Sequence, residues 1–386
     1  MDCLPPYIGG SITLMQNLMQ NFDLNNCIAI TPSVWESKKI GVNVDETTKV
    51  KIKKYEVRFF SYFFERITRY GLNIFNLFFS VPSIVLSIIK NAKKHKPKVI
   101  FSCWPSNAFA ISAWIASKYL KLPLVFYLHD LWYETRIQFV EKKIVKYLER
   151  FIFKSASCLL VISEPTKHYL EKKYKLCNIK VLEHSVNSKI WDLSKIPNYN
   201  HRKIKKIIML GGVNKFNHDS VKVFSKVIDS IGKLEMMIFS KQSIKDLKET
   251  YDISIKNINT SFIDRSKLHV ELLKCDALYL PLGFNTLVKK EVEVVIPTRM
   301  MDYLPSGIPI ITHGPGNTWM IKQAKSNGWA FVIDSNKKNI VENHLNSFLG
   351  MDSYDKLIKN SHFEAKRRDS KLISKKLNDV LIKFSN

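Results

Sequence analysis

The segment IPTRMMDYLPSGIPIITHGPG, residues 296–316, predicts a short helix that runs directly into an apolar strand. The helix opens at Pro297 or Thr298, because proline in the first turn of a helix wastes no hydrogen-bond donor. It ends at Gly307, since glycine accepts the backbone conformation of a helix C-terminus. The apolar run IPIIT that follows is typical of a strand buried inside a parallel sheet. This order indicates an α/β fold.

Two series of strands alternating with helices extend through the chain and predict two doubly wound, Rossmann-like domains that face each other across a cleft. The first series has strands at 27–33, 98–104, 122–130 and 156–164, and helices at 11–21, 57–94 with breaks, 107–120, 138–154 and 165–173. The second has strands at 206–212, 234–240, 253–263, 276–282, 308–312 and 330–334, and helices at 218–231, 266–274, 299–305, 317–327 and 361–384.

The length of 386 residues favours two domains. The polar segment 195–203, KIPNYNHRK, is typical of a linker. We therefore predict an N-terminal domain over 1–194, a C-terminal domain over 204–360, and a C-terminal helix over 361–386 that packs back toward the N-terminal domain. Residues 2–22 fit the loop and helix that follow a first strand, but no strand pattern precedes them. The first strand of the N-terminal domain is therefore expected to be missing.

The chain carries 60 Lys and Arg against 34 Asp and Glu, a formal net charge of +26. This excess favours an anionic partner such as nucleic acid, an anionic membrane surface or a phosphorylated ligand. A lysine-rich composition that spreads solvated charge over the surface explains it equally well. The six cysteines have no paired spacing, which predicts reduced thiols in a cytosolic protein, with neither a disulfide framework nor a zinc site.

No secretory leader is expected from the opening residues. Residues 70–89 approach the length of a membrane span, but Asn73, Asn76 and Pro82 interrupt them, so we predict a buried or interfacial helix. The stretch 49–79 interleaves basic and aromatic side chains and suits an anionic lipid surface. Domain packing with a solvated basic edge is the alternative.

Ligands of open parallel sheets bind beyond the carboxyl ends of the strands. Gly9 and Gly10 precede a predicted helix, where backbone N–H groups can approach an anion closely. His129 ends a predicted strand and can donate to a sugar hydroxyl or a phosphate. An ordinary Gly-Gly turn, and a helix capped by Asp130 with His129 packed beside it, explain the same residues.

A second glycine loop follows the strand 206–212. Gly211 and Gly212 lie between this strand and a helix, and Lys215 comes shortly after them. A flexible loop with a lysine at a helix start suits a diphosphate. The spacing matches neither the dinucleotide fingerprint nor a Walker loop, and Lys215 is otherwise one solvated lysine among many.

The segment 296–316 holds the third group of polar residues. Its helix would offer N–H groups near Thr298 to an anion, and Arg299 can hold a diphosphate with two hydrogen bonds. Asp302, about one turn further on, shares a face with Arg299 and can accept hydrogen bonds from both hydroxyls of a ribose. A surface ion pair between Arg299 and Asp302 is the alternative.

The segment 296–316 resembles the nucleotide-binding segment of retaining GT-B glycosyltransferases of family 4, in the branch that reads roughly fPtKl-eYla-G-Pii-hgP. The resemblance continues in the family's order along nearly the whole chain. It includes PPYIGG (5–10), the stretch from KPKVIF to YLHD (96–130), LLVISEPTKHYL (159–170), VLEHSVN (181–187), IIMLGGVNKF (207–216) and the stretch from SKLHVE to LPLGF (266–284).

The resemblance implies two Rossmann-like domains, a nucleotide-sugar donor held mainly by the C-terminal domain, and retention at the anomeric carbon. It implies that Asp302 clamps the ribose in place of the usual glutamate and that Arg299 meets the diphosphate. It also assigns Lys215 as a second cation, Gly9 and Gly10 to the phosphates, and His129 to the donor sugar near the reacting centre.

The chain departs from the family pattern at one acidic position. The family's two glutamates have seven residues between them, and the first of them falls on Val294. Glu291 and Glu293 lie nearby but out of register. Many members of this branch also lack that glutamate. Glu293 is assigned only a minor part in assisting the reaction at the donor sugar.

We therefore predict a retaining glycosyltransferase that moves a sugar from a nucleoside diphosphate sugar to a hydroxyl of a lipid-linked glycan in cell-surface polysaccharide synthesis. No metal, cofactor or nucleic acid is expected to take part. The predicted location is the cytoplasm, peripheral on the inner face of the plasma membrane. The alternatives are a non-catalytic or truncated glycosyltransferase-like subunit and, more distantly, a basic nucleic-acid-binding protein.

Overall fold

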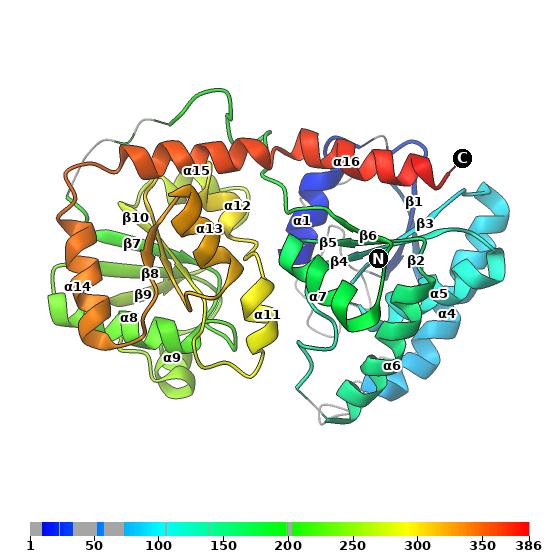
Figure 1. Cartoon of the computed structure of the whole chain (residues 1–386), viewed down its shortest axis with the longest axis horizontal. Helices are drawn as coiled ribbons and strands as arrows, with labels where there is room; N and C mark the ends of the chain where they lie inside the picture. Colours follow the sequence, from blue (N-terminus) through cyan, green and yellow to red (C-terminus); the bar gives the residue numbers. More distant parts are fainter. Residues whose placement is uncertain are drawn as a thin grey trace. The chain divides into compact units, whose positions relative to one another are not determined.

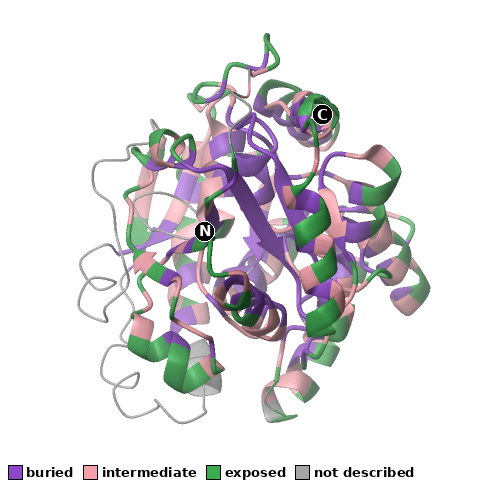
Figure 2. Ribbon diagram, turned by 90° about the vertical axis from the view of Figure 1, so that its left-hand side faces the viewer, coloured by how far each residue is buried: buried purple, intermediate pink, exposed green. Residues whose placement is uncertain are grey.

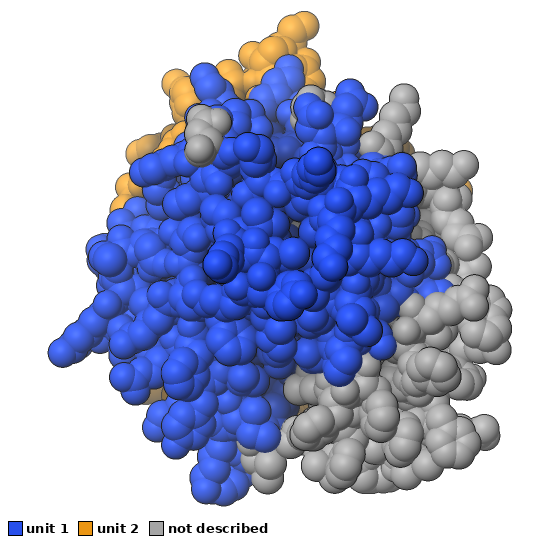
Figure 3. Space-filling view, turned by 90° about the vertical axis from the view of Figure 1, so that its right-hand side faces the viewer, with its two compact units in different colours: residues 1–185, 370–386 blue, residues 186–369 orange. Residues whose placement is uncertain are grey.

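The structure is a computed structural model that describes residues 10–22, 24–33, 52–57, 73–104, 106–137, 139–197, 199 and 203–385, apart from the side chains of 73–79 and 140. The chain divides into two compact units (Figures 1 and 3). Unit 1 comprises residues 1–185 and 370–386, and unit 2 comprises residues 186–369. Unit 1 is thus built from both ends of the chain.

Unit 2 contains one parallel sheet between helices. Its elements are β7 (Lys206–Leu210), α8 (His218–Ile231), β8 (Glu235–Phe239), α9 (Ile244–Tyr251), β9 (Ile258–Ser261), α10 (Leu268–Leu272), β10 (Ala277–Pro281), α11 (Lys289–Val294), α12 (Met300–Tyr303), β11 (Ile310–His313), α13 (Trp319–Asn327), β12 (Phe331–Ile333), α14 (Lys338–Leu349) and α15 (Asp355–Arg367).

The strand order of unit 2 is β12-β11-β10-β7-β8-β9, with every neighbouring pair parallel. The chain leaves β7 toward β8 and β9, then returns to the other side of β7 at β10. This reversal is the topological switch point of a doubly wound sheet, where ligands bind beyond the strand ends. The order therefore places a ligand site between the carboxyl ends of β7 and β10.

Apolar residues at helical spacing attach α8 to this sheet. Val221, Phe224 and Ile228 recur on one face of the helix and are fully buried. The ring of Phe224 stacks on that of Tyr279 in β10, with centroids 3.9 Å apart and planes 12° apart. Figure 2 shows the strands as the buried layer and the helices as exposed on their outer sides.

Replacing Phe224 by alanine should remove this stacked contact and leave a cavity. We expect the free energy of unfolding to fall by about 3–5 kcal/mol, measured by urea denaturation. Phe363→Ala, at a half-exposed position of α15 in the same unit, is the matched control and should change it by less than about 0.5 kcal/mol. Equal costs at both positions would contradict this packing.

Unit 1 is also parallel, but its strands form two separate sheets. Its elements are α1 (Gly10–Met19), β1 (Ile28–Pro32), β2 (Lys53–Val57), α4 (Asn73–His95), β3 (Ile100–Trp104), α5 (Asn107–Leu120), β4 (Leu124–Leu128), α6 (Phe139–Ser155), β5 (Cys158–Val161), α7 (Glu164–Tyr174), β6 (Ile179–Val181) and α16 (Ser370–Lys383).

One sheet of unit 1 pairs β1 with β2, and the other has the order β3-β4-β5-β6. The expectation of a missing first strand concerns the residues before α1, and residues 1–9 lie outside the described part of the chain. The C-terminal helix α16 packs on α1, where Ser374 Oγ donates to the Leu18 carbonyl over 2.5 Å.

Several elements differ from the sequence-based expectation. The strands β2 and β6 and the helices α9, α11 and α14 were not predicted. The helix expected over 361–384 is two helices, because the Arg368 carbonyl accepts a hydrogen bond from the Val186 N–H over 2.7 Å instead of continuing one helix. In consequence α15 lies in unit 2 and α16 in unit 1.

The predicted buried or interfacial helix corresponds to α4, which packs against α5 through residues such as the fully buried Ile84. Within the described part of the chain, no helix has both the length and the apolar character to cross a membrane. Most of the basic and aromatic stretch 49–79 lies outside the described residues.

Candidate active site

The switch point of unit 2 is held together by one tyrosine. The hydroxyl of Tyr303 in α12 accepts a hydrogen bond from the Leu210 N–H of β7 over 2.6 Å and donates to the Tyr279 carbonyl of β10 over 3.3 Å. Tyr303 is fully buried, so these bonds fix α12 against both strands at the point where they diverge.

Arg299 lies one turn before Tyr303 and reaches the glycine loop after β7. A Cβ atom built on Gly211 would lie 3.7 Å from the guanidinium carbon Cζ, so the loop backbone and this cation are in contact distance. Gly211 has φ +80°, which favours glycine. Arg299 and the glycine loop, two of the predicted ligand-binding positions, therefore lie close together.

The guanidinium of Arg299 has no counter-ion among the described residues. The Nη1 atom of Arg299 is buried without a hydrogen-bond partner. The surface pair between Arg299 and Asp302, which was the alternative interpretation of the sequence, does not form, because Asp302 pairs with Arg265. Burial lowers the pKa of Arg299 below its ordinary value. A buried charge that lacks a partner is costly, and an arriving anion removes that cost.

The loop after Gly211 is fixed by side chains from outside it. Gln242 accepts from the Val213 N–H over 2.7 Å and donates to the Val213 carbonyl over 2.9 Å. A Cβ on Gly212 would lie 2.5 Å from Gln242 Oε1, so no larger residue fits without displacing that glutamine. Lys215 lies further along the loop, with its Nζ 5.3 Å from the ring centroid of Phe216.

Asp302 is held by an arginine that the sequence analysis did not single out. Nη1 and Nη2 of Arg265 each donate to one carboxylate oxygen of Asp302 over 2.7 Å, in a bidentate ion pair. Asp302 is only 6% exposed. Arg265 lies in the loop after β9, and nothing in the sequence around it indicates that it pairs with Asp302.

The helix that carries these residues is shorter than predicted. The structure gives α12 as Met300–Tyr303, where the sequence indicated 299–305. The N–H groups of Met300, Met301 and Asp302 already donate to the carbonyls of residues 297, 298 and 299 over 2.9–3.1 Å. Thr298 contributes one of these carbonyls. The expected open helix end therefore offers few donors, and Arg299 is the main cationic feature.

The remaining predicted residues belong to other elements of the chain. Glu293 in α11 forms an ion pair with Lys290. Gly10 begins α1 in unit 1 and is exposed, and Gly9 lies outside the described residues. No group of three or more His, Cys, Asp or Glu side chains arranged to hold a metal ion occurs in the described part of the chain.

His129 follows β4 in unit 1 and is 2% exposed. Both ring nitrogens are buried and have no hydrogen-bond partner among the described residues. Its ring meets that of Tyr127 edge-on, with centroids 4.4 Å apart. Burial lowers the pKa of His129 from 6.5 to about 3, so the imidazole is neutral at physiological pH. A neutral imidazole can donate from one nitrogen and accept at the other.

Comparison with known proteins agrees with this architecture. Residues 50–189 match the family model described as Glycosyltransferase Family 4. The chain has the GT-B fold, and one segment of it is similar to family 4. The family match supports a glycosyltransferase function, as the sequence analysis predicted. No curated protein sequence matches the chain.

Solved GT-B structures resemble the chain over nearly its full length. A glycosyltransferase from Rickettsia africae ESF-5 has a TM-score of 0.66 at 14% identity, covering 99% of this chain and 97% of that one. Anabaena Alr3699/HepE, in complex with UDP and glucose, has a TM-score of 0.66 at 10% identity, covering 97% and 96%. An α,α-trehalose 6-phosphate synthase from Burkholderia multivorans has a TM-score of 0.61 at 10% identity, covering 99% and 94%. At these identities the likeness establishes the fold.

The burial of His129 predicts acid sensitivity. Because its pKa is lowered on folding, the unfolded chain binds the extra proton between about pH 6.5 and pH 3, and stability falls as the pH drops through that window. His129 alone should cost about 2 kcal/mol at pH 5 relative to pH 8. His129→Asn should lose this part of the pH dependence in urea denaturation.

The control for this prediction is the same pair of proteins at pH 8, where the imidazole is neutral whether folded or unfolded and only packing differs. The compared quantity is the difference in unfolding free energy between the original protein and His129→Asn. If this difference is the same at pH 5 and at pH 8, the prediction of a buried, neutral imidazole is contradicted.

Proposed function

We propose that the chain transfers a sugar from a nucleoside diphosphate sugar to a hydroxyl acceptor, and that Arg299 receives the diphosphate. The observation that carries the proposal is the partnerless guanidinium beside Gly211 at the switch point. Arginine binds phosphate oxygens in pairs, and the adjacent loop backbone can approach them closely. The UDP named for the Anabaena neighbour supports the nucleotide, and UDP is the probe of choice.

In the proposed reaction the bond between the anomeric carbon and the diphosphate oxygen breaks. The acceptor oxygen bonds to that carbon on the same face, and the acceptor proton passes to the diphosphate oxygen. Negative charge therefore grows on the leaving diphosphate, where Arg299 stabilises it, and Lys215 is proposed as a second cation. His129, neutral in the fold, is proposed to hydrogen-bond the donor sugar.

Asp302 is proposed to bind the ribose while it remains paired with Arg265. A carboxylate has about four lone-pair directions, and the bidentate pair uses two of them. The pair also holds the carboxylate in one orientation, so little entropy is lost when the ribose hydroxyls donate to it.

The acceptor is proposed to be a lipid-linked glycan at an anionic membrane surface, with the product entering cell-surface polysaccharide. The net charge of +26 supports this assignment. Retention at the anomeric carbon is proposed from the resemblance to family 4. A non-catalytic subunit is the second candidate, favoured by the two separate sheets that the described strands of unit 1 form. Release of sugar from the donor by the purified chain separates the two.

Arg299→Met should weaken UDP binding without destabilising the protein. Loss of a charge-assisted hydrogen-bond pair should weaken UDP affinity by roughly 10- to 100-fold in calorimetry. The thermal midpoint of the ligand-free protein should stay level or rise, because a buried charge without a partner is removed.

Arg367→Met is the matched control for this prediction, since Arg367 is exposed on α15 in the same unit, and it should change neither quantity. A lower midpoint for Arg299→Met with unchanged UDP affinity would make Arg299 a structural residue and contradict the proposal.

Asp302→Asn should weaken the binding of UDP by tenfold or more but leave the binding of pyrophosphate unchanged, because pyrophosphate has no ribose. Both affinities are measured by calorimetry on the same protein preparation. If the affinities for UDP and pyrophosphate fall together, Asp302 supports the fold of the site and does not contact the ribose. If neither affinity falls, the role of Asp302 is limited to its ion pair with Arg265.

A further inference from the structure

Two loops follow the neighbouring strands β7 and β10 at the switch point of unit 2. The glycine loop, residues 211–217, connects β7 to α8. Residues 282–288, which we call the β10 loop, connect β10 to α11. The two strands are paired in parallel, so both loops leave the sheet at the same edge. Contacts between these loops therefore bear on the place where Arg299 meets the glycine loop.

Backbone donors of the glycine loop are largely taken up inside the protein. The Asn214 N–H donates to Asn217 Oδ1, and the Phe216 N–H donates to Asn214 Oδ1, both over 2.9 Å. The Asn217 N–H donates to the Asn214 carbonyl over 3.1 Å. What this part of the loop can offer to an anion is therefore mainly the side chain of Lys215.

The β10 loop fixes the backbone of Lys215. Thr286 Oγ1 donates to the Lys215 carbonyl over 2.6 Å. The Gly283 N–H donates to the next carbonyl along, that of Phe216, also over 2.6 Å. Thr286 is only 5% exposed, so its hydroxyl is largely shielded from water. Two consecutive carbonyls of the glycine loop are thus held by the loop that follows the neighbouring strand.

Asp219 in turn fixes the β10 loop to α8. It lies in the first turn of α8, where the helix dipole favours an acidic side chain. Its Oδ2 atom accepts from the Phe284 N–H over 2.9 Å and from the Asn285 N–H over 2.6 Å. Because α8 directly follows the glycine loop, these bonds close a ring that runs from Lys215 through Thr286 to Asp219 and back along the chain.

We propose that Thr286 and Asp219 are positioning residues, which hold the backbone of Lys215 so that its ammonium group meets the diphosphate. The inference rests on the proposed function, in which Lys215 is the second cation. A lysine side chain loses conformational entropy when a ligand fixes its end. With the backbone already fixed, only the side chain has to be ordered, so binding costs less. Thr286 and Asp219 act through Lys215 and do not touch the ligand.

The test is a double-mutant cycle between Thr286→Val and Lys215→Met, with UDP affinity measured by calorimetry. Thr286→Val should weaken UDP binding by roughly three- to tenfold, because one hydrogen bond is lost. In the Lys215→Met background it should cause no further loss, since the residue that it positions is gone. Thr286→Ser keeps the hydroxyl and should keep the affinity of the original chain.

A second variant approaches the ring from α8. Asp219→Ala should also weaken UDP binding, and again only while Lys215 is present. Thr286 Oγ1 also accepts from the Val288 N–H over 3.2 Å, so Thr286→Val is expected to lower the thermal midpoint as well. The effect on UDP affinity must therefore be separated from a loss of stability.

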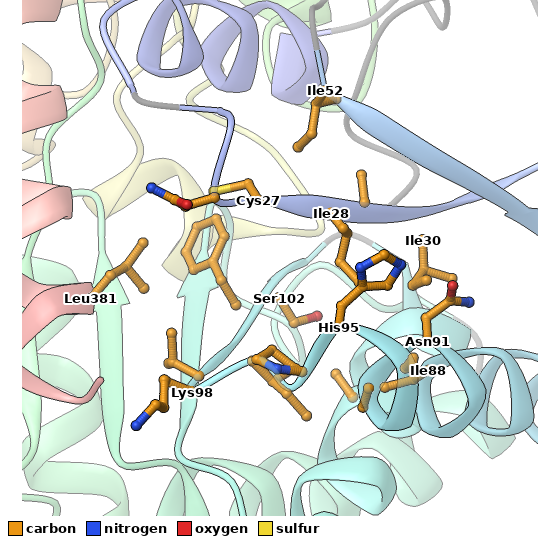
Figure 4. A pocket seen from close by; sticks show the side chains of 18 of the residues that line it. Cys27, Ile28, Ile30, Ile52, Ile88, Asn91, His95, Lys98, Ser102 and Leu381 are labelled. Carbon is orange, nitrogen blue, oxygen red and sulfur yellow. The ribbon is translucent and has the colours of Figure 1, made fainter. Parts of the chain in front are cut away.

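Two controls make this separation. Thr250→Val repeats the chemical change at an exposed position of α9 and should alter neither quantity. Ile88→Ala removes an apolar side chain from the wall of a cavity of about 450 Å³ in unit 1 (Figure 4). It should lower the midpoint and leave UDP affinity unchanged, because Ile88 belongs to the other unit.

The positioning role is overturned, with the proposed function intact, if the losses from Thr286→Val and Lys215→Met simply add. It is equally overturned if Ile88→Ala weakens UDP binding as much as Thr286→Val does, since the effect would then follow stability alone. A chain that does not bind UDP at all overturns the proposed function and this inference with it.

Discussion

The hydroxyl of Tyr303 bonds to β7 and to β10 and so decides where Arg299 can lie. With Tyr303 fixed in the crevice, the residue one turn earlier on the same helical face must lie above the strand ends. That position brings the guanidinium of Arg299 against Gly211, away from any acidic partner among the described residues. The strand topology thus holds in place a charge without a counter-ion among the described residues. In the proposed function, this arrangement gives up stability for affinity.

The ion pair between Arg265 and Asp302 also keeps Arg299 without a counter-ion. Asp302 lies three residues after Arg299, where a carboxylate would ordinarily neutralise it. Because Arg265 takes both carboxylate oxygens, Asp302 is neutralised from elsewhere and the charge of Arg299 is preserved. Two arginines and one aspartate leave a net positive charge at the strand ends, which suits the diphosphate proposed as ligand.

Much of the fold could be predicted from the sequence, because internal parallel strands are continuous apolar runs. The strands β7 and β10 were found in this way. The strands β2 and β6 were not, since each lies at the edge of its sheet and carries lysines, so neither shows an apolar run. At the site, Arg299 and the glycine loop could be placed near each other from the sequence, because both were assigned to the edge of the sheet where its strands end. The Arg265–Asp302 pair joins residues 37 apart in sequence and depends on a loop path that local patterns do not encode.

The two unusual features of the molecule are separable. Arg299, Gly211, Tyr303 and the Arg265–Asp302 pair all lie in unit 2, whose sheet is continuous from β12 to β9. The two separate sheets of described strands lie wholly in unit 1. Because each unit buries its own core, a change in the core of unit 1 is expected to leave the strand ends that place Arg299 unaltered. Such a change should therefore affect the proposed contribution of His129 without affecting the proposed nucleotide site.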